Sequence, residues 1–508
     1  MKKIICLLLA MLLVLPLAVA CNNDEKPPVV TGDNGDATDP ADSGDATDPA
    51  DSGDATDPGN TPASSNKLDT SAMDFGNADF HMVAFDWQAY SHYFFADEDS
   101  SDPMQSAIYT RKSMIEEEIG VKISSTLYTG YGDMYPAIDQ NVGTGDDSIQ
   151  LALIHCISGV SNYASNGTMF PLEELPNLQL DAEWWNQEQM DAIRLGKSYF
   201  WGVNDFMIPT PYIVFFNKDM VDELNLENPY DLVANNQWTL DKFDEMARAA
   251  TRDTDTNGTW DDADNYGISY YDGSELISFW SSSDQYVGKK NEDGKLEIVL
   301  NTEKAVDILE LIADWSKDHV TQISVSGNGL DCLGMDSNQC LFWLSNVASA
   351  EMLRTCEVNY GILPFPKYNA EQEDYMHLDW GGLMGVLTTI RDPEMVGAVV
   401  ELRAYDSGET VIPAYYDKVL DGQLAQDPKS SDMLDIIFDT VIYDPAVNYF
   451  GLSGSIFKLF YQPWFDAHLK GTSLFASTWQ EHSAAAEKQI EDFYAALELT
   501  ESLNDMMG

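Results

Sequence analysis

Basic residues are scarce in this chain of 508 residues. It has 27 lysines and arginines against 85 aspartates and glutamates, which gives a formal net charge of −58 at pH 7. That charge repels nucleic acid and anionic lipid head groups, and it argues against nucleic acid as a partner. It suits a protein outside the cytoplasm with a neutral or cationic ligand. The length and a hydrophobic content of 44% predict about two folded domains.

Motifs of catalysis are also missing. The sequence contains no GxSxG elbow, no HExxH pair and no glycine loop for phosphate, and its seven histidines are scattered without metal-ligand spacing. We therefore expect that the protein is not an enzyme. A surface glycoside hydrolase stays open as an alternative, because its two carboxylates are brought together only by folding.

Cysteine is rare as well. Of six cysteines, two lie in the first 21 residues. The others form no CxxC-type metal cluster. Their oxidation state stays open: three of them are close enough in sequence for a disulfide, and free buried thiols are equally compatible. These four residues are Cys156, Cys332, Cys340 and Cys356.

One long apolar run is present, at the N-terminus. Lys2 and Lys3 precede apolar residues 4–17, and small residues follow before Cys21. This order is typical of a secretory signal peptide and is too short for a membrane span. The sequence LAVAC resembles a bacterial lipobox, which predicts a signal over residues 1–21, lipidation of Cys21 and anchoring to the outside of the cell membrane. Ordinary cleavage near Ala20 is the alternative.

Residues 22–72 have almost no large apolar side chains. The nine-residue unit GDATDPADS begins at Gly35 and Gly44, and a truncated copy begins at Gly53. Such a composition cannot bury enough surface to offset its ordering entropy. We expect a disordered acidic linker that holds the folded body away from the lipid surface.

The folded body begins with alternating strands and helices. Apolar patterns predict strands over residues 79–87, 121–128 and 150–156, and helices over 104–119 and 133–142. This alternation indicates an α/β lobe with a largely parallel sheet. Ligands of such sheets lie beyond the carboxyl ends of the strands. The residues at these ends are Trp87, Tyr90, His155 and Ser158.

Further elements follow. Residues 203–208 and 212–216 form a hairpin-like pair of apolar runs, and Thr239 caps a predicted helix over 240–251. A strand is expected over residues 266–271, a helix from Thr302 to residue 315, and a glycine-rich strand from Trp380 to residue 386. Helices over residues 393–407, 433–441 and 483–497 complete the body.

An acid-rich loop between residues 253 and 264 has the ligand spacing of an EF-hand. Oxygen ligands at alternate positions suit Ca²⁺, and a glycine at the sixth position supplies the sharp turn. Aspartate takes the twelfth position, where glutamate is usual. We predict a structural Ca²⁺ site, with a non-binding acidic turn as the alternative. Its ligands would be Asp253, Asp255, Asn257, Thr259, Asp261 and Asp264.

An ordered set of motifs carries a family resemblance. GKSYFWG, FFNKD, WTLDKF, the acidic loop, VNYGILPFPK and WGGLMGVLTT occur in this order from residue 196 onward. The set resembles bacterial extracellular solute-binding proteins of sugar ABC transporters, in particular maltose-type receptors. The resemblance implies a monomer that delivers a carbohydrate to the transmembrane subunits of an importer.

The same resemblance implies two discontinuous α/β lobes joined by a hinge. Its crossings fall near Met207, Ile362 and Val419. The N-terminal lobe would then comprise residues 73–206 and 362–418. The C-terminal lobe would comprise residues 207–361 and 419–508.

Sugar recognition needs flat aromatic faces together with carboxylates or amides. The resemblance places ligand-stacking positions at His155, Phe216 and Trp280. The residue types add other candidates, although core packing is the alternative for each aromatic. The further candidates are Trp87, Tyr163, Asp205, Asp284, Asp379, Trp380 and Gly381.

We expect an oligosaccharide between the lobes. The alternative is that the same fold binds a peptide, a polyamine or another cation, which the acidic charge would attract.

Overall fold

The computed structural model describes residues 66–85, 95–96, 100–156, 158–205, 207–271, 273–323, 338–353, 358–379, 381–418, 427–451 and 454–507. The predicted signal peptide, Cys21 and most of the repeat linker lie outside these ranges. Within the described ranges no helix is long and apolar enough to cross a membrane.

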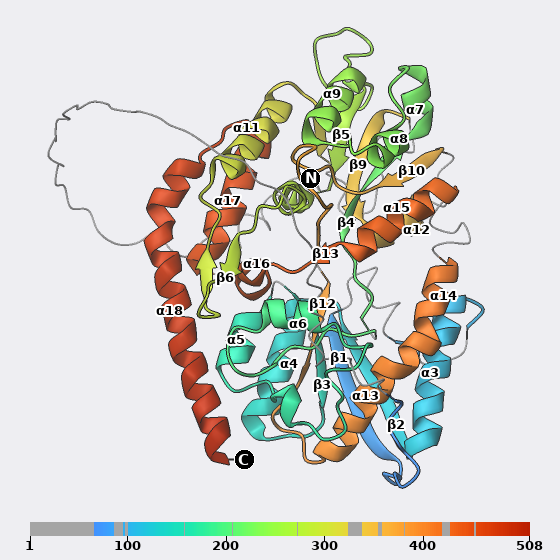
Figure 1. The fold of residues 1–508 in the computed structure, drawn as a ribbon, viewed down its shortest axis with the longest axis vertical. Coiled ribbons are helices and arrows are strands. Elements are labelled where there is room, and N and C mark those ends of the chain that lie inside the picture. Colours follow the sequence, from blue (N-terminus) through green and yellow to red (C-terminus); the bar gives the residue numbers. More distant parts are fainter. Residues whose placement is uncertain are drawn as a thin grey trace, which may run out of the picture. The chain divides into compact units, whose positions relative to one another are not determined.

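A four-stranded sheet in the order β12-β3-β1-β2 organises the first lobe (Figure 1). Strands β2 and β3 pair in parallel with β1, and β12 pairs antiparallel with β3. Its elements are β1 (Ala78–Phe85), α3 (Pro103–Ile119), β2 (Val121–Tyr128), α4 (Tyr131–Thr144), β3 (Leu151–His155), α5 (Val160–Ser165), η1 (Leu172–Glu174), α6 (Gln187–Ile193), β12 (Gly382–Val386), α13 (Pro393–Glu409) and α14 (Val411–Lys418).

The two crossover helices lie on opposite faces of this sheet. The chain steps from β1 through α3 to β2 on one side, then back across β1 through α4 to β3. Because parallel crossovers are right-handed, steps in opposite directions place their helices on opposite faces. Helix α3 packs against α13 and α14, as Figure 1 shows. The predicted largely parallel α/β lobe is confirmed.

A five-stranded sheet in the order β10-β4-β9-β5-β8 organises the second lobe. Its first elements are β4 (Tyr212–Asn217), α7 (Lys218–Glu223), α8 (Pro229–Ala234), α9 (Leu240–Ala250), β5 (Tyr266–Tyr270), η2 (Ser274–Ile277), α10 (Ser278–Ser282), β6 (Gly288–Lys290) and β7 (Leu296–Ile298). They continue with α11 (Glu303–Lys317), β8 (Thr321–Ile323), β9 (Cys340–Asn346), η3 (Val347–Ser349), α12 (Ala350–Leu353), β10 (Tyr360–Leu363) and β11 (His377–Leu378). The last are α15 (Pro428–Asp439), β13 (Val441–Ile442), α16 (Pro445–Phe450), α17 (Gly454–Lys470) and α18 (Phe475–Met507).

Helix α9 lies at the centre of the hydrophobic core of the second lobe. The Thr239 side chain caps it by accepting from the Lys242 amide, and Phe243 lies at the middle of its buried stripe. The Phe243 ring lies 4.6 Å from the Phe342 ring and 5.7 Å from the Trp315 ring, measured between centroids. Aromatic pairs at these separations add stabilisation beyond the area they bury. The predicted capped helix is therefore confirmed.

The second connection between the lobes lies later in the chain than expected. Gly202 still pairs with Met384 beside the first sheet, and β4 begins the second sheet at Tyr212, so the first crossing passes Met207. Ile362 lies inside β10 of the second sheet, so the second crossing comes later, between β10 and β12. The backbone of β10 is hydrogen-bonded to β4 of the second sheet, so the chain cannot cross to the first sheet within this strand. The expected crossing near Val419 lies outside the described residues.

Two local expectations are wrong. The described residues 203–205 and 207–208 form no strand paired with β4, because this segment carries the chain between the lobes. Residues 66–72 belong to the folded body, since Lys67 forms ion pairs with Glu118 at 2.8 Å and with Asp406 at 3.0 Å.

Cys156 and Cys340 are buried free thiols. Burial raises the pKa of both, that of Cys340 to about 12, so both thiols stay protonated. Cys332 and Cys356 lie outside the described residues.

Candidate functional site

The lobes meet at identifiable edges of their sheets. In the first sheet, β12 starts at Gly382 opposite His155, the last residue of β3, so the chain arrives from the second lobe at the carboxyl edge of β3. In the second sheet, β4 starts at Tyr212 opposite Asn346, the last residue of β9. Strand β5 runs parallel to β9 and ends at the same edge. These two edges are where a ligand of both lobes would lie.

His155 lies at the edge of the first sheet, as its position at the end of β3 predicts. Its side chain is 9% exposed. Burial lowers its pKa to about 4, so the imidazole is neutral at pH 7 and offers one donor and one acceptor.

Tyr163 lies on α5 next to this edge, with Tyr135 of α4 packed against it. The two ring centroids are 5.7 Å apart at an interplanar angle of 80°. The Tyr135 hydroxyl donates to the Ser158 carbonyl at 2.8 Å, which fixes the turn after β3. Tyr163 is 2% exposed, so its ring faces are covered by the protein.

Two aromatic candidates of the second lobe are core residues in this structure. Trp280 is 1% exposed, its ring meets the Trp464 ring edge-on at 4.4 Å, and its Nε1 donates to the Ala305 carbonyl. Phe216 is 2% exposed and packs against Tyr230 at 5.1 Å. A covered ring offers no face for a sugar, and we do not retain either residue in the proposed ligand set.

The acidic candidates have different surroundings. Asp205 is half-buried, and desolvation together with the charge of Glu183 raises its pKa to about 6. Asp284 is exposed and lies 3.6 Å from the Lys289 ammonium. Asp379 is 2% exposed and accepts hydrogen bonds within the protein.

The Gly381 carbonyl accepts a hydrogen bond from the Cys156 amide at 2.9 Å. This bond joins the residue before β12 to the residue after β3. Trp87, Tyr90 and Trp380 lie outside the described residues.

An aromatic stripe on α17 escaped the sequence analysis. Phe457, Tyr461 and Phe465 recur every four residues and are all half-buried. The centroids of Phe457 and Tyr461 are 4.6 Å apart with nearly parallel rings, and those of Tyr461 and Phe465 are 4.8 Å apart. The FxxxYxxxF spacing is the signal that would have found this stripe.

The stripe leads to the edge of the second sheet. His468, one turn beyond Phe465, lies 5.3 Å from the Phe465 ring and 5.9 Å from the ring of Tyr270, the last residue of β5. Tyr271 follows with an exposed side chain. The α17 stripe is therefore joined to the end of β5 through the buried rings of His468 and Tyr270, while the stripe's own rings are half-buried.

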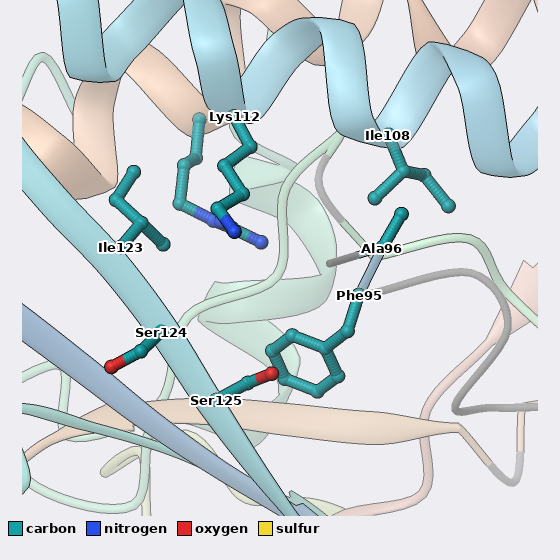
Figure 2. Close-up of a pocket in the computed structure, with 8 residues that line it drawn as sticks. Phe95, Ala96, Ile108, Lys112, Ile123, Ser124 and Ser125 are labelled. Atoms are coloured by element: carbon teal, nitrogen blue, oxygen red, sulfur yellow. The ribbon is translucent and has the colours of Figure 1, made fainter. Parts of the chain in front are cut away.

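Two cavities involve the described residues of the first lobe. The one in Figure 2, between α3 and β2, has a volume of about 10 Å³ and is lined by Phe95, Lys112, Ser125 and their neighbours. That volume holds about one water molecule. The other is an open groove of about 500 Å³ that begins at Tyr128, the carboxyl end of β2, and runs along α4 past Gln140 to Asp146. Its volume is in the range of small-molecule sites.

The acidic loop before β5 brings three carboxylates together. One oxygen from each of Asp253, Asp255 and Asp264 lies within 4.8 Å of the others. Asp253 Oδ1 is buried without a hydrogen-bond partner among the described residues. Asp264 is 1% exposed and accepts from the Thr254 and Asp261 amides, which fixes its orientation. A buried carboxylate oxygen without a donor fits a cation ligand.

The remaining predicted ligands are placed around this cluster. Gly258 has a φ of +76°, the left-handed turn expected at the sixth position. Asn257 Oδ1 accepts from the Thr259 amide, and Asp261 Oδ1 accepts from the Ala263 amide. The donor set is all oxygen and therefore fits a hard cation such as Ca²⁺.

No protein-family model matches the sequence, and no curated protein matches it. Solved structures do match. The ABC substrate-binding protein Lmo0181 from Listeria monocytogenes, in complex with cycloalternan, is 12% identical with a TM-score of 0.55, over 81% of this chain and 99% of that one. The fold is that of a two-lobed solute-binding protein.

Two other receptors share this fold. The GacH receptor of Streptomyces glaucescens, solved with acarbose, is 13% identical with a TM-score of 0.54, over 81% of this chain and 99% of its own. The galacto-N-biose/lacto-N-biose I-binding protein of an ABC transporter from Bifidobacterium longum is 11% identical with a TM-score of 0.57, over 83% and 98%. The expected two-lobed class is thereby confirmed.

Proposed function

We propose that the protein is the substrate-binding component of an ABC importer and that it binds an oligosaccharide between its lobes. The observation that carries the proposal is the fold, which matches receptors solved with cycloalternan, acarbose and lacto-N-biose over at least 81% of this chain. The half-buried rings of the α17 stripe supply aromatic faces for sugar rings. His155, the last residue of β3, marks the facing edge of the first lobe.

In this function the protein binds and releases its ligand without chemical conversion. Cys21 carries the lipid, the acidic repeats keep the body away from the membrane, and the permease subunits receive the sugar. Mass spectrometry of the protein from membranes tests the anchor: diacylglyceryl modification of an N-terminal Cys21 is expected, and an unmodified N-terminus near that position contradicts it.

Calorimetry tests the ligand class. The mature protein without its lipid is titrated with cycloalternan, acarbose, lacto-N-biose and linear oligosaccharides, and with a polyamine and a short basic peptide. We expect heat from at least one saccharide. Heat from the polyamine or peptide alone would establish the cationic alternative, and its affinity should fall steeply with salt and on replacement of Asp205 or Asp284 by asparagine. Release of reducing ends from polysaccharides would instead indicate a hydrolase.

Removal of a ring from the α17 stripe should weaken saccharide binding. We expect Tyr461→Ala and Phe457→Ala each to raise the Kd of the saccharide found above about 10-fold, because each loses a stacking contact worth on the order of 1 kcal/mol. Tyr109→Ala, a half-buried tyrosine on α3 of the other lobe, is the matched control and should leave the Kd unchanged. If all variants bind with the wild-type Kd and unfold at the wild-type temperature, the stripe is not part of the ligand site.

We further propose that the acidic loop binds structural Ca²⁺ through Asp253, Asp255 and Asp264, with Asn257, the Thr259 carbonyl and Asp261 as additional ligands. Chelation should lower Tm by roughly 3 °C if calcium is otherwise present at about 100 times its Kd. Asp253→Asn should abolish this response, and Asp262→Asn, next to the cluster, should preserve it. A Tm that is unchanged on chelation of the wild-type protein would show that the loop binds no ion.

A further inference from the structure

Asp379 lies where the connections between the lobes come together. It follows β11 directly and precedes the crossing into β12, and its side chain is 2% exposed. Its Oδ1 accepts from the Thr210 amide at 2.8 Å, and its Oδ2 accepts from the Tyr443 hydroxyl at 2.7 Å. Both bonds are short, and both of their donors come from other segments of the chain.

The partners of Asp379 belong to separate segments. Thr210 lies in the first crossing, between the Gly202 bridge and β4. Tyr443 lies between β13 and α16, and the Asp379 amide donates to Ile442 of the same segment at 3.1 Å. One side chain therefore joins its own crossing to two other segments.

The backbone around Asp379 is also tied to the first sheet. Cys156, which follows β3, places its thiol 3.8 Å from the Asp379 carbonyl and donates its amide to Gly381. On the other side, β11 pairs in parallel with β13 through His377 and Leu378. Asp379 thus lies between a fixed strand of the first lobe and the segments that lead into the second.

A role as a sugar ligand fits these contacts poorly. The side chain is almost fully buried and each of its oxygens accepts a bond from the protein, so a sugar hydroxyl has little room to approach it. The contacts instead fit a group whose hydrogen bonds hold the backbone of the crossings in one geometry.

We infer that Asp379 is a positioning residue of the hinge: its carboxylate couples Thr210 to Tyr443 and thereby sets the equilibrium between open and closed lobes. The inference rests on the proposed function in one respect, which is that binding of a ligand closes the lobes. A hinge rotates through a few backbone positions that absorb the dihedral change. Residues 207–211 and Asp379 are such positions, and the bond between Thr210 and Asp379 makes them move together.

Hydrogen exchange of the ligand-free mature protein, with calcium in the buffer, tests the inference. In Asp379→Ala, amides of residues 207–211 and 440–444 should exchange at least about 10-fold faster, and small-angle scattering should give a changed radius of gyration without ligand. Tyr443→Phe should shift the same amides in the same direction by less. Asp374→Ala, an exposed acid on the same connection, is the matched control and should change neither observable.

The outcomes separate the alternatives. If Asp379→Ala and Tyr443→Phe leave exchange and scattering of the ligand-free protein unchanged, the inference is wrong, whatever happens to binding. Should Asp379→Ala fail to fold, Tyr443→Phe decides alone, because it removes one hydroxyl from a buried ring. Absence of saccharide binding in the wild-type protein would overturn the proposed ligand and leave the ligand-free measurements valid.

Discussion

Replacement of Glu401 by alanine is expected to lower the free energy of unfolding by about 3–5 kcal/mol. Glu401 is fully buried on α13, where its carboxylate accepts from Trp184 Nε1 at 2.9 Å and from Trp185 Nε1 at 3.0 Å. It also accepts from the amide and the side chain of Gln179. Alanine leaves the two buried indole N–H groups without this acceptor, and each such loss costs about 1–3 kcal/mol in isolation.

Denaturant unfolding followed by tryptophan fluorescence measures this loss. Glu401→Gln should fall between wild type and alanine, because its amide keeps one acceptor and directs a donor at the other indole N–H. Glu409→Ala, on an exposed face of the same helix, should stay within about 0.5 kcal/mol of wild type. A loss for Glu401→Ala no larger than that control would mean that the segment before α6 is held by packing alone.

Asp444 is expected to make stability depend on pH between about 4 and 6. It is 3% exposed, caps α16 through the Ala446 and Val447 amides, and accepts from the Val287 amide at the start of the β6–β7 hairpin. Desolvation raises its pKa to about 6 despite these donors. A raised carboxyl pKa means that the native state holds the proton more tightly, so stability falls as pH rises from about 4 through 6.

Urea unfolding of wild type and Asp444→Asn at pH 4, 5, 6 and 7 tests this expectation. Wild type should lose stability relative to the asparagine variant as pH rises, by on the order of 3 kcal/mol for a shift of about two units. Asp444→Ala should be destabilised at every pH, because it loses the cap and the hairpin contact together. A pH-independent difference between wild type and Asp444→Asn would show that the carboxyl titrates normally in the folded protein.

Local patterns predicted much of the fold. Some elements are encoded within about ten residues of sequence. Examples are α9, with its Thr239 cap and apolar stripe, the glycine that ends α3, and the apolar run of β3. Helix α17 was missed because Pro463 lies inside it and because its half-buried rings Phe457, Tyr461 and Phe465 widen its apolar face, which blurs the amphipathic period. The folded body begins before residue 72, the predicted end of the linker, because Lys67 forms ion pairs with carboxylates of α3 and α13.

The ligand residues were harder to predict, since they depend on distant contacts. The resemblance indicated a stacking role for Trp280, yet the structure packs Trp464 and Phe475, from far along the chain, against its ring. The sequence supplies the residue types of a sugar site but not which ring faces stay uncovered. The acidic loop is different, because its six predicted ligands lie within twelve residues, and the structure brings three of its four predicted carboxylates, Asp253, Asp255 and Asp264, together.

Helix α18 restricts how the lobes rotate. Within its 33 residues the Tyr494 hydroxyl accepts from Leu296 of the hairpin, and the Thr500 hydroxyl donates to Ser165 of the first lobe. Glu501 accepts from the Lys197 amide at 2.6 Å. A rotation that preserves these bonds has its axis near α18, so atomic displacement grows with distance from that helix. Helices α14 and α15, on the opposite side in Figure 1, therefore lie where a pair of spectroscopic labels would register the largest change in distance.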